Sequence, residues 1–572
     1  MKFRRLNLAF KSRVLPSRRA ADRVSGQLQA SLDSRNCYWA AIILGVVAVV
    51  LRLYRLGDME VWLDEALTGY LGYSDDWLQR VHNTPPLYYW IVRNWLAISN
   101  FDASSLRLPS VVAGGLFVVL ATLTANEIFG RRAGIFAGLF AALSPLHLYY
   151  SQEARAYSLL MTEIMFVYLM LWRTARGAGT GSWIGLVVGT AMAVYTHFLA
   201  IIPVGIGYLV IAAPRGLSVR VAIRYIAALL VAMLAVVPWL IWWKSTTEFA
   251  ASDFSWVERV WAIIPIWRQI PLSLEVFYLG SQQGLVPVLA KQFLQLEFLP
   301  ILRWLGLFSL TVVLLFSIWR CRLENADVRA RFLQSILLVF VPLLLLLGVS
   351  FFRPIYIVGR YDLVAFPAFV IWLGFALSLI TSRKHGVSIF GAILIVCALV
   401  SPITVKLINY FEFESRSEAD QIARQIIDAA EHDDLFVMVG PSVVRLVYYL
   451  RTNGIKWEDG VCRSTTSDQE FRCRMLPLGL EVAPAAVQRY YLAARDGWLI
   501  RDIEQVISEA DYPRRVRLVF MEAKRNQSGS LAFPAETRPV LQKTIDSGYA
   551  VTSVDTQSNV VALQRRSGIV PE

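Results

Sequence analysis

Long apolar stretches separated by short polar intervals dominate the first 405 residues of the chain. A helix of about 20 apolar residues crosses the hydrocarbon core of a bilayer, so each stretch of this length predicts a membrane span. About eleven spans are predicted on this criterion, at residues 38–56, 106–125, 133–150, 156–173, 183–198, 199–213, 224–243, 299–319, 331–351, 363–381 and 387–405. The outer segment near 244–298 is apolar enough to hide a further helix or a re-entrant pair.

The shorter apolar stretch at residues 87–98 decides on which side of the membrane every later loop lies. It is short for a span, carries Arg93 and Asn94 in its middle, and has the Tyr and Trp content of a helix lying in the interface. We therefore expect an interfacial helix. This choice places Arg131 and Arg132, and the basic residues that follow later spans, on the cytoplasmic side, as the positive-inside rule requires.

Beyond residue 405 the pattern changes to that of a soluble α/β domain, 406–572. Helical spacing covers 418–430, buried strands are predicted at 435–439 and 515–521, and a terminal hairpin at 549–552 and 560–564 turns at 557–559. The basic tail at 1–37 is expected to stay in the cytoplasm, and an odd number of spans puts the C-terminal domain on the outer, extracytoplasmic face. There, an oxidising compartment permits a disulfide between Cys462 and Cys473, and two free thiols are the alternative.

The composition supports a membrane protein and argues against other classes. The 572 residues are 56% hydrophobic, with a mean hydropathy of +0.49, which excludes a soluble globule of this length. A net charge of +13 could suggest nucleic acid, but loops at one membrane face explain the basic residues better, so no nucleic-acid partner is expected. The chain has no Gly-Lys dipeptide, which excludes a nucleotide-binding P-loop.

Acids and arginines gather at the predicted outer ends of the membrane helices. A carboxylate there can take a proton from a hydroxyl, and arginines bind phosphate through paired hydrogen bonds. This chemistry fits transfer of a group from a lipid phosphate to a hydroxyl or amine. The histidines have no zinc-site spacing. The candidate residues are Asp64, Glu65, His82, Glu153, Arg155, His197, Arg360 and Tyr361.

These residues also have purely structural explanations, which the sequence leaves open. Asp64 and Glu65 could begin an interfacial helix, where carboxylates favour the positive end of the helix dipole. Arg155 and Arg360 could be membrane anchors, although arginines on the outer face run against the positive-inside bias.

Several short motifs resemble, in the same order, those of the GT-C glycosyltransferases. They are W-L-D-E-A at 62–66, P-P-L-Y-Y at 85–89, L-R-L-P-S at 106–110, S-Q-E-A-R-A-Y-S-L-L at 151–160, and G-R-Y with F-P-A-F within 359–369. The chain most resembles the bacterial branch similar to protein O-mannosyltransferases, the lipid A aminoarabinose transferase and the rhizobial lipopolysaccharide galacturonosyltransferases. The resemblance covers the membrane part, residues 38–405.

The resemblance implies a polytopic α-helical fold of the GT-C type and an inverting transferase in the plasma (inner) membrane. Such an enzyme moves a hexosyl or pentosyl group from a polyprenyl-phosphate sugar to an envelope glycan, lipid or protein on the extracytoplasmic face. Some GT-C enzymes need a divalent metal and many do not; one acid pair without a second carboxylate motif favours a site with no metal or other cofactor.

The resemblance also implies roles for individual residues. Asp64 takes the position of the catalytic base, and Glu65 supports the site or the acceptor. Arg155, Arg360 and Tyr361 would hold the lipid phosphate. Possible substrate contacts without an assigned counterpart are His82, Glu153 and His197.

Two other functions share some of these features. A transporter or flippase of lipid-linked sugars would place its charges near the midplane and repeat its halves, whereas here the charges lie at one face and no repeat is visible. A glycan ligase or polymerase that uses a diphosphate-linked donor would share the outer arginines.

Overall fold

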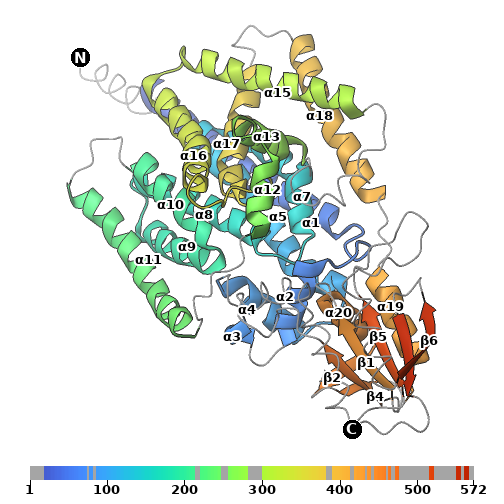
Figure 1. Ribbon diagram of the computed structural model, residues 1–572. Coiled ribbons are helices and arrows are strands. Elements are labelled where there is room, and N and C mark those ends of the chain that lie inside the picture. The colour runs from blue at the N-terminus through green and yellow to red at the C-terminus, as the bar shows by residue number, and fades with distance from the viewer. Residues whose placement is uncertain are drawn as a thin grey trace, which may run out of the picture.

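The computed structural model (Figure 1) describes residues 18–73, 77–80, 85–212, 219–246, 255–280, 299–381, 389–412, 418–431, 434–439, 443–458, 461–465, 470–475, 515–520, 549–555 and 560–565. The first half of the helical part comprises α1 (Arg18–Leu53), α2 (Leu63–Tyr73), α3 (Trp77–Arg80), α4 (Leu87–Leu96), α5 (Ala103–Phe129), α6 (Arg131–Leu143), α7 (Pro145–Ser151), α8 (Tyr157–Ala175) and α9 (Thr180–Thr196). The second half comprises η1 (Phe198–Ala200), α10 (Ile201–Gly207), η2 (Tyr208–Ala212), α11 (Val219–Thr246), α12 (Ser255–Ile263), α13 (Ile266–Leu279), α15 (Leu299–Cys321), α16 (Ala326–Ser350), η3 (Asp362–Ala365), α17 (Phe366–Ile380) and α18 (Ile389–Glu412).

Eight helices in the described part of the chain are long and apolar enough to cross a membrane, and each coincides with a predicted span. They lie in α1, α5, α8, α11, α15, α16, η3 with α17, and α18. The span predicted at 133–150 is the pair α6 and α7, which is bent by 59°. The spans predicted at 183–198 and 199–213 correspond to α9, of 17 residues, and to the short helices from Phe198 to Ala212. The prediction of about eleven full spans therefore exceeds the eight, or nine with the bent pair, that length and apolarity support here.

The bend between α6 and α7 is stabilised by a buried arginine. Ser144 ends α6 and caps α7, its hydroxyl oxygen accepting from the His147 N–H at 3.3 Å. Arg52 of α1 is fully buried and donates to the carbonyl oxygens of Ala141 and Ala142 at 3.1 and 3.2 Å and to His147 Nδ1 at 2.7 Å. Carbonyl groups at the end of a helix lack intrahelical partners, so the guanidinium satisfies the groups that the bend leaves open.

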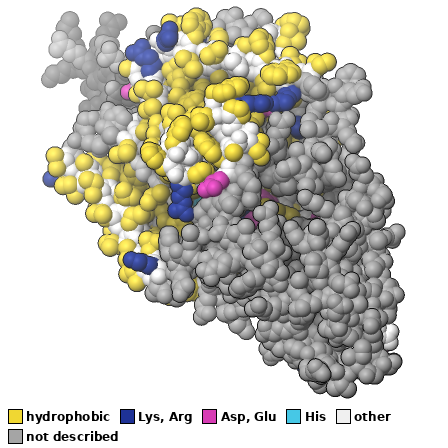
Figure 2. Space-filling view, viewed as in Figure 1, with side chains coloured by type: hydrophobic (Ala, Val, Ile, Leu, Met, Phe, Trp, Pro, Cys, Tyr) yellow, Lys and Arg dark blue, Asp and Glu magenta, His cyan; other side chains and the backbone are white. Residues whose placement is uncertain are grey.

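The centre of the membrane part is built from α5, α6, α8 and α17, which pack closely on one another. Small residues allow this approach: a Cβ at Gly138 would lie 2.1 Å from the Thr122 hydroxyl oxygen, and one at Gly374 would lie 2.7 Å from the Ala133 carbonyl oxygen. α17 is almost entirely buried, whereas α11, α15 and α18 expose many large apolar side chains. Hydrophobic side chains accordingly dominate the described surface in Figure 2, as expected for helices in contact with lipid.

The segment expected to lie in the interface forms α4, a helix of ten residues that is too short to span. It packs on α2 and α5 and buries Tyr88, Tyr89 and Val92. α1 begins at Arg18 and α18 ends at Glu412, so each helix extends past a residue at which a domain boundary is predicted, 37 and 405. The division into domains stays a prediction.

The C-terminal domain is an α/β unit, as predicted. It contains α19 (Glu418–Ala429), α20 (Val443–Thr452), β1 (Asp434–Val439), β2 (Ile455–Glu458), β3 (Val461–Ser464), β4 (Glu470–Met475), β5 (Arg515–Phe520), β6 (Tyr549–Asp555) and β7 (Val560–Arg565). The strand order is β2-β3-β4-β1-β5-β7-β6, with β1 parallel to β4 and β5 and the remaining pairs antiparallel. Helix 418–430, both buried strands and the terminal hairpin are confirmed; the turn at 557–559 lies outside the described residues.

The helix α20 and the strands β2 to β4 were not predicted. Phe436 of β1 and Leu446 of α20 share the small core of this domain with α19. Cys462 of β3 is disulfide-bonded, and its expected partner Cys473 lies on the adjacent strand β4. The side chain of Cys473 is outside the described part of the structure, and the pairing of the two stays a prediction.

Candidate functional site

The two adjacent acids begin α2, and their side chains leave the helix in different directions. Asp64 and Glu65 lie in the first turn, where carboxylates interact favourably with the helix dipole. Successive residues of an α-helix are rotated by about 100°. Asp64 and Glu65 thus begin a helix, as the purely structural explanation expects, but each carboxylate also has its own partners.

Glu65 is locked in a buried ion pair. Its two oxygens accept from Nε and Nη2 of Arg107, both at 2.8 Å, and both side chains are only 2% exposed. The Ala154 N–H donates to Glu65 Oε1 at 2.8 Å, and the Trp62 N–H to Oε2 at 3.4 Å. With this many donors, Glu65 joins α2 to α5 and to the loop that precedes α8.

Arg107 also holds the loop that leads from α1 to α2. Its guanidinium donates to the carbonyl oxygens of Leu56, Met59 and Glu60 at 2.8 to 3.1 Å. Charge-assisted bonds of this kind are roughly twice as strong as neutral ones. The loop that leads into α2, just before Asp64, is thus fixed from the membrane side.

Asp64 lies between the two candidate arginines, which come from distant parts of the chain. Its Oδ2 is 2.6 Å from Arg360 Nη2 and 3.6 Å from Arg155 Nη2, and 23% of the side chain is exposed. Burial raises the pKa of this carboxyl, but Arg155 and Arg360 more than offset that effect and hold it below its usual value. Asp64 is therefore ionised at neutral pH.

Aromatic residues orient the two arginines. Arg155 donates to the Tyr89 hydroxyl at 3.0 Å, and Arg360 Nε donates to the Tyr157 hydroxyl at 2.6 Å. The guanidinium of Arg360 lies 5.7 Å from the ring centre of Tyr157, 5.9 Å from that of Trp62 and 6.0 Å from that of Tyr361. Such distances permit cation–π attraction. Tyr361 therefore lies beside Arg360, and its part in donor binding stays a prediction.

Glu153 is a third acid at the same place. It is 4% exposed, and its Oε2 has no hydrogen-bond partner among the described residues. Burial, together with the nearby Glu65 carboxylate, raises the pKa of Glu153 to about 8, although Arg155 and Arg360 lower it in part. Glu153 is therefore largely protonated at neutral pH, and its carboxyl does not cancel the charge of the arginines.

The structure describes one of the two candidate histidines, His197. His197 ends α9, and its Nδ1 accepts from the Leu199 N–H at 3.1 Å. Its ring centre lies 6.0 Å from those of Tyr157 and Tyr361, so it borders the site through the aromatic residues. His82 lies outside the described residues.

The sequence analysis missed three side chains that build the site: Arg107, Tyr89 and Tyr157. All three lie inside motifs that carried the resemblance, namely L-R-L-P-S, P-P-L-Y-Y and S-Q-E-A-R-A-Y-S-L-L. In the described ranges, no group of three or more His, Cys, Asp or Glu side chains is placed to hold a metal ion. A metal-free site stays a prediction.

These features define a class: a multi-pass membrane protein whose first loop presents an acid to two arginines. A family model described as dolichyl-phosphate-mannose-protein mannosyltransferase matches residues 83–242. The chain is similar to the crystal structure of ArnT from Cupriavidus metallidurans in the apo state, with a TM-score of 0.56 and 12% identity over 91% of this chain and 97% of that one. It is also similar to the same protein bound to undecaprenyl phosphate, with a TM-score of 0.55 and 14% identity over 93% and 99%.

A comparison with curated proteins found no match. At 12 to 14% identity, the likeness to ArnT concerns the fold. The family model supports the resemblance read from the motifs over residues 83–242, and over most of the chain the fold is similar to that of ArnT.

Proposed function

We propose that this protein is an inverting glycosyltransferase that moves a sugar from a polyprenyl phosphate to an acceptor hydroxyl or amine. The observation that carries the proposal is the ionised Asp64 carboxylate held between Arg155 and Arg360. The GT-C fold supports it, and so does the similar ArnT structure, which holds undecaprenyl phosphate. The acceptor would be an envelope glycan, a lipid or a protein on the extracytoplasmic face of the plasma membrane.

The charge of the site suits an anionic donor. Asp64 carries one negative charge against the two positive charges of Arg155 and Arg360, and Glu153 is largely neutral. Arg155 Nε is buried and has no hydrogen-bond partner among the described residues, which is costly unless a ligand supplies an acceptor. A phosphate on the donor would supply that acceptor and the missing negative charge.

The transfer step follows from these positions. Asp64 takes the proton of the acceptor O–H or N–H as the acceptor atom attacks the anomeric carbon of the sugar. The bond between that carbon and the phosphate oxygen breaks on the opposite side, which inverts the configuration. The electron pair of the broken bond leaves with the polyprenyl phosphate, and Arg155 and Arg360 stabilise the added negative charge. No proton needs to be given to the phosphate.

The other candidate residues take supporting roles. Glu65 positions the loops through Arg107 and Ala154 and does not act on substrate. Tyr361 and His197 border the donor phosphate or sugar. Glu153, in its neutral form, can donate a hydrogen bond from its carboxyl to the substrate.

The test is an assay of the purified protein in lipid vesicles with a panel of undecaprenyl-phosphate sugars and envelope acceptors, following release of free undecaprenyl phosphate by mass spectrometry. Asp64→Asn should lower the rate by about 10²- to 10⁴-fold, the usual contribution of a general base. The matched control is Asp58→Asn on the same loop, because Asp58 is 49% exposed and forms an ion pair with Arg55, with 2.6 Å between Oδ2 and Nε. Control activity should stay near the wild type.

Three results would overturn the proposal. Full activity of Asp64→Asn would remove the base. Consumption of diphosphate-linked donors alone would indicate a ligase or polymerase. Movement of intact lipid-linked sugar across the vesicle membrane, without transfer, would indicate a flippase.

A further inference from the structure

The helix α20 of the C-terminal domain lies against the loop and helix that carry Asp64. In Figure 1 the domain lies beside α2 and α4, and α20 is the element that packs on α2. Val444 and Tyr448 of α20 are buried in one apolar cluster with residues of α2, α4 and α5. A Cβ at Gly69 of α2 would lie 3.1 Å from the Tyr448 ring, so glycine permits the close approach of the two helices.

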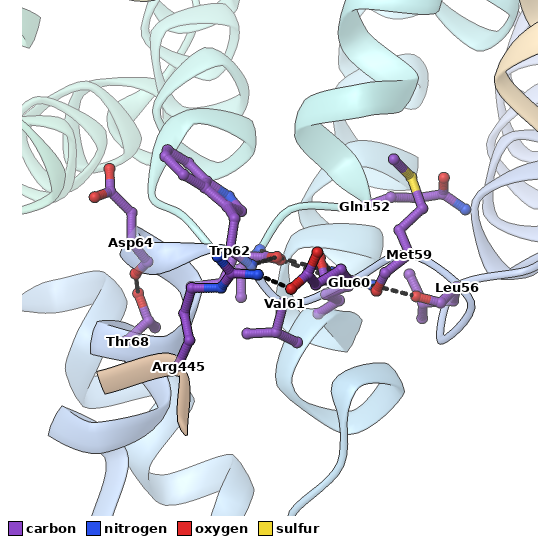
Figure 3. Close-up of polar contacts among 12 residues, drawn as sticks. Leu56, Met59, Glu60, Val61, Trp62, Asp64, Thr68, Gln152 and Arg445 are labelled. Atoms are coloured by element: carbon purple, nitrogen blue, oxygen red, sulfur yellow. Dashed lines mark hydrogen bonds and ion pairs between the residues drawn. The ribbon is translucent and has the colours of Figure 1, made fainter. Parts of the chain in front are cut away.

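Two polar contacts fix the loop just before Asp64. Arg445 forms an ion pair with Glu60, and the two side chains are 17% and 22% exposed. The Val61 N–H donates to the Tyr449 hydroxyl at 2.9 Å. Figure 3 shows Arg445 reaching Glu60, while the Asp64 carboxylate points away from this pair.

A third contact fixes the other end of α2. The guanidinium of Arg451, in the last turn of α20, lies 3.8 Å from the ring centre of Tyr73 and 5.1 Å from that of Phe101. Tyr73 is the last residue of α2. Residues of α20 therefore contact both the loop before α2 and the last residue of α2, the helix that carries Asp64.

The loop thus has supports on both sides. Arg107 binds its carbonyl oxygens from the membrane part, and α20 binds the Glu60 side chain and the Val61 N–H from the C-terminal domain. Val61 is fully buried, so its N–H would lose its hydrogen-bond partner if Tyr449 lost its hydroxyl. Asp64 follows only three residues later and must be held at the arginines to act.

We propose that α20 is a positioning element of the transferase site: Arg445 and Tyr449 hold the loop so that Asp64 reaches Arg155, Arg360 and the acceptor. This inference rests on the proposed function and gives the C-terminal domain a part in it. Arg445 and Tyr449 act through Glu60 and Val61 and do not contact substrate.

The experiment compares four full-length variants in lipid: Arg445→Met, Tyr449→Phe, the exchange Glu60→Arg with Arg445→Glu, and the control Arg424→Met. Arg424 lies on α19 of the same domain, is 64% exposed and, among the described residues, forms its ion pair with Asp420 of its own helix. The donor is whichever undecaprenyl-phosphate sugar of the panel the wild type consumes fastest. Hydrogen exchange of the peptide covering residues 58–66 is measured in the same samples.

Arg445→Met and Tyr449→Phe should each lower kcat by about tenfold, since small displacements at a reacting group cost up to about 100-fold. The KM for the donor should change less than about twofold, because the arginines that bind it are untouched. The loop peptide should exchange faster in both variants. The charge exchange should recover most of kcat, and Arg424→Met should match the wild type.

An unchanged kcat together with unchanged exchange of the loop in Arg445→Met and Tyr449→Phe would overturn the inference. So would an equal loss in Arg424→Met, which would indicate a general effect on the domain. If the wild type transfers no sugar, the proposed function fails, and hydrogen exchange alone then decides whether α20 holds the loop.

Discussion

The buried pair of Glu65 and Arg107 should dominate the stability of the segment from the end of α1 to α2. Replacing Glu65 with Gln keeps the shape of the side chain and one acceptor oxygen but leaves the Arg107 charge without a counterion at a place that is 2% exposed. Removing one partner of a buried pair costs about 3–5 kcal/mol. That is a large part of the total stability of a typical domain, about 5–15 kcal/mol.

Arg107→Met should cost at least as much as Glu65→Gln. It leaves Glu65 unpaired and also removes the donor to the carbonyl oxygens of Leu56, Met59 and Glu60. Each buried carbonyl that loses its donor costs about 1–3 kcal/mol unless water replaces it. The double variant should lose less than the sum of the two single ones, because neither charge is then left alone.

The measurement is the free energy of unfolding in mixed micelles for both single variants, the double variant and the control Glu127→Gln. Glu127 pairs with Arg176 at 2.7 Å, but these side chains are 29% and 35% exposed, so its loss should cost less than about 1 kcal/mol. A double-mutant cycle should give a coupling of about 0.5–3 kcal/mol between Glu65 and Arg107. A coupling of zero, or a Glu65→Gln cost no larger than that of Glu127→Gln, would refute the reasoning.

Three further predictions concern the donor site and its protons. Tyr157→Phe removes the hydroxyl that accepts from Arg360 Nε at 2.6 Å, and steady-state kinetics should show the KM for the donor rising about tenfold. Because Arg155 and Arg360 lower the pKa of Asp64, the rate should not fall as the pH drops from 7 to 5; an acid limb with its midpoint above 5 would contradict this. Glu153, with its pKa raised from 4.5 to about 8, binds a proton in the folded state that it loses in the unfolded state, so stability should fall as the pH rises from 4.5 to 8. Thermal unfolding of Glu153→Gln across that range should lack this contribution.

The membrane helices could be predicted because lipid imposes a simple rule: a helix of about 20 apolar residues satisfies its own backbone. That rule does not show where a helix breaks. The bend at Ser144 depends on Arg52, which is distant in the sequence and was counted as part of an ordinary span. Nor could α20 be read from V-V-R-L-V-Y-Y-L-R-T, since β-branched and aromatic residues in a short apolar run suit a strand as well as a helix.

The sequence indicated some members of the candidate site, but not Arg107, Tyr89 or Tyr157, and not which charged side chains pair with one another. The predicted topology placed Asp64, Arg155 and Arg360 on one face of the membrane. In the structure, the Asp64 carboxylate lies 2.6 Å from Arg360 and 3.6 Å from Arg155. Nothing in a single sequence shows that Glu65 selects Arg107, because both acids of the pair have the same helical setting and the partner lies forty-two residues away. Long-range pairing of charges needs the fold.

The contacts of Glu65 show how Asp64 comes to lie beside Arg155. Glu65 Oε1 accepts from the N–H of Ala154, and this bond joins the loop of Asp64 to the loop of Arg155. Asp64 directly precedes Glu65, and Arg155 directly follows Ala154. The bond between Glu65 and Ala154 therefore brings the Asp64 carboxylate within 3.6 Å of the Arg155 guanidinium. In the proposed function, the two adjacent acids thus have different tasks: a base must stay partly open to substrate, whereas a counterion stabilises best when it is buried and fully hydrogen-bonded.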